Sequence, residues 1–110
     1  MNDLPDAERV GKAINFLANT DEDYGRLCAA VSAMEHRIKS LKASKYLETS
    51  GTVGERQAIV DSSKAYRGWI EKMENVTADR EIMRARRKTA ELLIELWRSV
   101  NSARGKGLIT

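Results

Sequence analysis

The sequence predicts an all-α fold: an antiparallel helical bundle of one short and three long helices with coiled-coil-like packing. Apolar residues recur at steps of three and four, which is the spacing of one face of an α-helix. This ladder consists of Tyr24, Leu27, Val31, Met34, Ile38 and Leu41. Nothing in the chain alternates with the two-residue period of a strand. The 110 residues include a single proline and are 42% hydrophobic and 32% charged, the balance of a helical protein.

The short helix is expected over residues 4–19. Asp3 can cap its first turn, where Pro5 is tolerated because that position needs no N–H. Its apolar positions follow at steps of three, four and three: Ala7, Val10, Ile14 and Leu17. Thr20 then reads as the N-cap of a long helix over 21–48, whose first turn carries the acidic residues 21–23. We favour helix capping over metal binding for this acidic triplet.

The clearest boundary in the chain follows that helix. Residues 49–51 contain a glycine and form a helix stop, and Thr52 with Glu55 matches the capping box of the next helix. This third helix is expected over 53–75. Its apolar pattern changes phase near Asn75, which favours a break with Thr77 as a cap, although one long helix that changes partners is the alternative. The fourth helix is expected over 77–104, followed by a flexible tail over 105–110.

The composition indicates one domain over residues 1–110, with a thin, mainly aliphatic core. Only one Phe, two Trp and three Tyr are present, and both tryptophans, Trp69 and Trp97, are expected to pack at helix contacts. Because thin apolar faces often complete their burial against a second copy, we expect a homodimer. No membrane-spanning run, secretion signal or pair of cysteines is visible, so we expect no membrane partner and a location in the cytoplasm of the cell in which the protein is made.

Reactive groups are too few to indicate an enzyme. His36 is the only histidine, and its neighbours on a helix face include neither a carboxylate nor another metal ligand. Cys28, the only cysteine, reads as a small buried apolar residue rather than a nucleophile. We therefore expect no catalysis, no metal, no cofactor and no small-molecule substrate.

A cluster of basic residues gives the strongest functional hint. Residues 1–35 carry a net charge of −4 and residues 36–110 one of +7. Four cations share one helical stripe, with Arg86 nearer the apolar ladder: Arg80, Arg84, Arg87 and Lys88. We predict that this stripe contacts nucleic-acid phosphates or an acidic partner surface. The alternative is that these charges are solvated and pair with Glu81 and Glu91. No aromatic residue lies in the cluster, so any nucleic-acid contact would be directed to the backbone.

Several segments resemble small helical proteins encoded by bacteriophages and prophages. The likeness lies in residues 7–9, 20–23, 54–58 and 95–99. The resemblance implies an accessory protein of the early region, near recombination genes, that touches DNA or DNA-handling proteins. It also implies that the cytoplasm in question is that of a bacterial host cell. It carries over no site residue. The rival hypothesis is a protein-interaction module that inhibits a host or defence protein.

Overall fold

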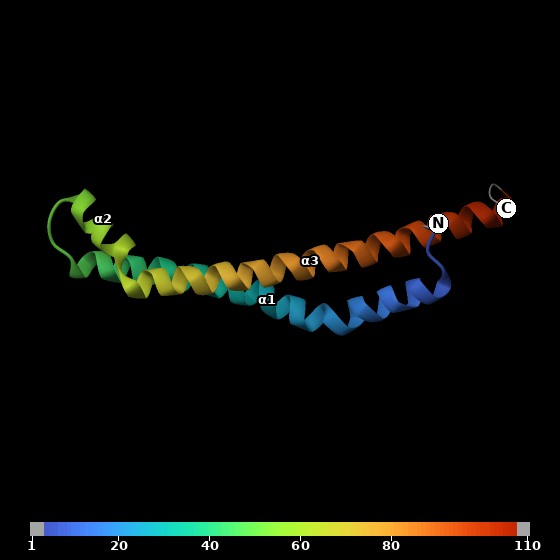
Figure 1. Cartoon of the computed structure of the whole chain (residues 1–110), viewed down its shortest axis with the longest axis horizontal. Coiled ribbons are helices and arrows are strands. Elements are labelled where there is room, and N and C mark those ends of the chain that lie inside the picture. The colour runs from blue at the N-terminus through green and yellow to red at the C-terminus, as the bar shows by residue number, and fades with distance from the viewer. Residues whose placement is uncertain (1–3, 108–110) are drawn as a thin grey trace. The chain divides into compact units, whose positions relative to one another are not determined.

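The all-α class is confirmed by the computed structural model, which describes residues 4–107. That part of the chain contains three helices and no strand: α1 (Ala7–Glu48), α2 (Val53–Ser62) and α3 (Lys64–Gly105) (Figure 1). It forms two compact units. The terminal unit joins the residues up to Tyr24 with those from Glu81 onward, and the central unit is Gly25–Arg80. No helix of residues 4–107 is long and apolar enough to cross a membrane.

The prediction of separate helices over residues 4–19 and 21–48 is wrong, because α1 runs unbroken from Ala7 to Glu48. Asp6 caps it, since its carboxylate accepts a hydrogen bond from the backbone N–H of Arg9 at 2.8 Å. Asp3, the predicted cap, lies outside the described residues. Thr20 does not cap a second helix, because its hydroxyl donates to the carbonyl oxygen of Phe16 at 2.7 Å, as mid-helix threonines do.

Along both long helices the less exposed residues recur at steps of three and four, the spacing of the predicted apolar ladder. In the central unit this burial confirms the predicted ladder, because Val31 and Ile38 are buried and Leu27, Met34 and Leu41 are half-buried. In the terminal unit the α1 positions are Val10, Ala13, Leu17, Thr20 and Tyr24. The antiparallel α3 segment of this unit has its own buried or half-buried positions: Met83, Arg87, Ala90, Ile94 and Trp97. Arg87 bonds to Leu17 of α1, and Ala90 lines a groove together with Ala13. We call this contact the terminal seam.

The capping box predicted at the start of α2 is confirmed. The backbone N–H of Glu55 donates to the Thr52 hydroxyl at 3.2 Å, and the Glu55 carboxylate accepts from the backbone N–H of Thr52. Gly51 precedes this box with φ 116°, a conformation that favours glycine. The cation–π contact of Arg56 with Tyr46 closes this end of the central unit, 3.9 Å from the ring centroid.

The predicted third and fourth helices, over 53–75 and 77–104, are also wrong in their bounds. The chain leaves the helical conformation at Ser63 (φ −65°, ψ 138°), and the Ser63 hydroxyl accepts from the backbone N–H of Tyr66 at 3.2 Å, so it caps α3. No break occurs near Asn75, because α3 continues to Gly105. The tail predicted over 105–110 begins as an exposed turn at residues 106–107, and residues 108–110 lie outside the described part.

The apparent change of phase near Asn75 has a physical explanation. The less exposed positions of α3 continue at steps of three and four through two arginines: Met73, Val76, Arg80, Met83, Arg87 and Ala90. A pattern of apolar residues alone leaves out both arginines. The sequence prediction therefore divides one continuous helix face into two.

Candidate functional site

Arg87 is turned into the terminal seam rather than outward. Its side chain is only 15% exposed. Its Nη1 donates to the carbonyl oxygen of Leu17 at 2.9 Å and to the Thr20 hydroxyl at 2.7 Å, and its Nη2 forms an ion pair with Asp21. The guanidinium also lies 5.2 Å from the centroid of the Tyr24 ring. Arg87 therefore joins α3 to α1 within the terminal unit.

The other members of the predicted stripe lie at different depths. Arg84 donates from Nε to the Tyr24 hydroxyl at 3.0 Å and pairs with Glu81, also at 3.0 Å. Lys88 is exposed and forms no ion pair with any residue from 4 to 107. Together with Arg87, Tyr24 and Glu91 they line a small hollow of about 150 Å³. Arg80 is half-buried in the central unit and has an interaction partner.

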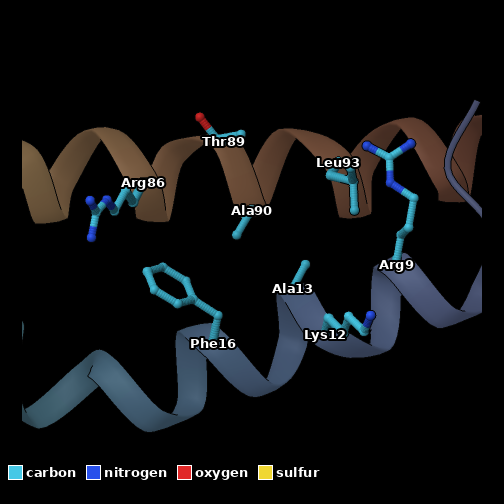
Figure 2. Close-up of a pocket in the computed structure, with 8 residues that line it drawn as sticks. All are labelled: Arg9, Lys12, Ala13, Phe16, Arg86, Thr89, Ala90 and Leu93. Carbon is cyan, nitrogen blue, oxygen red and sulfur yellow. The ribbon is translucent and has the colours of Figure 1, made fainter. Parts of the chain in front are cut away.

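A larger groove lies on another side of the terminal unit, with a volume of about 450 Å³. Its floor is apolar and comes from both helices: Ala13 and Phe16 of α1, and Ala90 and Leu93 of α3. Figure 2 shows these side chains pointing toward one another across the groove. The remaining lining residues are Thr89 and three cations, Arg9, Lys12 and Arg86. We call it the cationic groove.

Ion pairs among the described residues balance the charge of this groove only in part. Lys12 pairs with Glu8 at 3.4 Å, but both side chains are more than three-quarters exposed, so this pair is weak. The guanidinium groups of Arg9 and Arg86 form no ion pair with any described residue. An apolar floor between unbalanced cations suits a ligand that carries apolar and acidic groups side by side.

The described part of the chain offers no candidate metal centre beside these surfaces. No group of three His, Cys, Asp or Glu side chains gathers closely enough among residues 4–107 to hold a metal ion. His36 is exposed on α1, and the free thiol of Cys28 is half-buried.

No family model, curated protein or solved structure matches this chain.

The positions predicted for Arg86 and Arg87 are reversed in the structure, and the groove was not predicted. It put Arg86 near the apolar ladder and Arg87 on the outer stripe, whereas Arg86 is exposed beside the groove and Arg87 is in the seam. The groove had a weak signal, because Arg9, Ala13 and Phe16 follow at steps of four and three and so share a helix face. The partner face on α3, more than seventy residues away, cannot be read from that spacing.

Proposed function

We propose that this chain is a non-enzymatic binding protein that holds an acidic amphipathic helix of a protein partner in the cationic groove. The observation that carries the proposal is the apolar floor of Phe16 and Leu93 beside two cations, Arg9 and Arg86. Neither cation forms an ion pair with a residue that the structure describes. Helices that bind in grooves of this kind place apolar anchors one turn apart on a single face.

In this proposal a large apolar side chain of the partner packs between Phe16 and Leu93. Acidic side chains one turn away face Arg9 and Arg86, which guide association and fix the orientation of the helix. The bound helix also completes the antiparallel bundle that the sequence led us to expect. The resemblance to phage-encoded helical proteins suggests the class of partner, a DNA-handling protein.

A synthetic peptide tests this proposal. The probe is a fluorescent helical peptide with Leu at i and i+4 and Glu on the flanking positions, and its control has the same composition in scrambled order. We expect the ordered peptide to bind, and Arg9→Glu with Arg86→Glu to weaken binding about tenfold or more, measured by fluorescence anisotropy. The matched control is Arg98→Glu with Arg104→Glu, which reverses two exposed cations of α3 outside the groove.

Two results would refute the groove. One is equal affinity for the ordered and scrambled peptides. The other is an equal loss of affinity in the control with Arg98→Glu and Arg104→Glu and in the groove variant, because the effect would then reflect net charge alone.

Nucleic-acid contact is the second candidate function. It is favoured by Lys88, an exposed cation that lines the same hollow as Arg84 and forms no ion pair within residues 4–107. Such contact would be backbone-directed, so affinity for single- and double-stranded DNA should fall steeply across a salt series. Arg84→Ala with Lys88→Ala should reduce the slope of that series. Binding without salt dependence, or with an unchanged slope in the variant, would exclude this function.

A further inference from the structure

The outer face of α3 carries a second ladder with heptad spacing. Its six positions follow at steps of three, four, three, four and three: Ile82, Ala85, Thr89, Leu92, Leu96 and Ser99. The three largest side chains are exposed: Ile82 by 52%, Leu92 by 51% and Leu96 by 44%. The three smaller residues of the ladder are exposed as well. The Thr89 hydroxyl donates to the carbonyl oxygen of Ala85 at 3.1 Å, so it needs no partner elsewhere. We call this surface the outer ladder.

We propose that the outer ladder is a self-association surface on which α3 of a second copy packs antiparallel. Antiparallel helices alternate the two ladder positions across the contact. In one register Ile82 then faces the partner's Ser99, Ala85 faces the partner's Leu96, and Thr89 faces the partner's Leu92. Every layer sets a large side chain against a small one, so the faces interdigitate. A two-fold axis repeats each layer in reverse, as a closed dimer requires.

The charges beside the outer ladder select the same register. Lys88 and Glu95 lie on one flank, each one position before a ladder residue, and neither forms an ion pair with any residue from 4 to 107. In antiparallel packing, residues of one flank face the same flank of the partner. The register above sets Lys88 opposite the partner's Glu95, and symmetry repeats the pair.

The neighbouring registers are disfavoured. A shift by one heptad in one direction brings Glu95 against the partner's Glu95, and a shift in the other brings Lys88 against the partner's Lys88. A parallel dimer would set Ala85 against the partner's Ala85 and Ser99 against the partner's Ser99, which leaves holes between the larger layers.

Charge exchange tests both the surface and the register. Sedimentation equilibrium should show a dimer of the full chain. Lys88→Glu or Glu95→Lys alone should weaken it about tenfold, because each change turns two attractive pairs into repulsive ones. The double variant Lys88→Glu with Glu95→Lys should restore dimerisation to within about threefold. An equimolar mixture of the two single variants should form a heterodimer, since their charges are then complementary.

An apolar variant gives an independent measurement. Leu92→Glu should abolish the dimer, while Ile14→Lys, a change at a residue of α1 that is 50% exposed, should leave it intact. Circular dichroism checks that each variant remains helical. A monomer at every concentration of the unmodified chain would overturn the proposal. A dimer that survives Leu92→Glu would overturn the surface, and a double charge variant that stays as weak as the single variants would overturn the register.

Discussion

Replacing Arg87 by alanine should destabilise the terminal unit. The loss can be worked out from its contacts. The pair with Asp21 contributes little, because the Asp21 side chain is 67% exposed and returns to water. The bonds to the Leu17 carbonyl and the Thr20 hydroxyl are shielded, and we assign about 1 kcal/mol to each. The Thr20 hydroxyl still donates to Phe16, so truncation leaves it with a partner. With the lost packing on Tyr24, the total is about 2–3 kcal/mol.

Urea unfolding followed by circular dichroism measures this loss. A change of about 2–3 kcal/mol lowers the midpoint by roughly 1–2 M at a typical slope for a small protein. Arg87→Met keeps the aliphatic stem in the seam and should cost about 1 kcal/mol. Arg98→Ala, at an exposed position of α3 outside the seam, should stay within about 0.5 kcal/mol of the unmodified chain. If Arg87→Ala behaves like Arg98→Ala, Arg87 is not a seam residue.

Three further predictions test the continuity of α3, the capping box of α2 and the loop before α2. Ala78→Pro should cost about 3 kcal/mol or more in thermal or urea unfolding because α3 is continuous there, whereas a helix that began near residue 77 would tolerate the proline. Thr52→Ala should cost about 1 kcal/mol through the lost bond to the backbone N–H of Glu55; an unchanged unfolding midpoint would argue against the capping box. Arg56→Ala removes a 2.7 Å hydrogen bond to the carbonyl oxygen of Tyr46, so proteases should cleave residues 49–52 faster; equal cleavage rates would contradict this role.

The sequence was sufficient where local chemistry decides the structure. The apolar ladder of the central unit is shielded at every position from Leu27 to Leu41, and the capping box forms at the predicted residues. Both signals lie within a few residues, and neither depends on which distant segment packs against the helix.

The predicted helix bounds are wrong where tertiary contacts override the local helix-capping preference of a residue. Thr20 is a good N-cap residue by type, but Arg87 binds its hydroxyl and the seam continues through it, so the helix continues as well. Ser63 falls inside the helix predicted over 53–75, yet its hydroxyl caps α3, and the chain leaves the helical conformation there, between α2 and α3. Propensity is a weak prior in both cases, because packing and side-chain hydrogen bonds decide between similar local alternatives.

The basic stripe shows a related limit of sequence reasoning. A helical projection gives the angle of Arg87 correctly but does not reveal which face meets the other helix when charged residues occupy that face. Arg87 is accepted in the seam because Leu17 and Thr20 supply oxygen acceptors. A prediction of its burial therefore needs the register of α1 against α3, which the apolar pattern alone does not fix.

Arg87 also favours that register. Its guanidinium gains a hydroxyl acceptor where it faces Thr20, whereas the seam position seven residues earlier is Ala13, which has no side-chain oxygen. A slipped pairing would leave a shielded charge without these bonds, at a cost far above that of a mismatched apolar layer. Lys88 and Glu95 play the corresponding part in the dimer that we propose, at lower cost because they are exposed. In both contacts the apolar ladder drives association, and the charged side chains select one alignment among several that are similarly apolar.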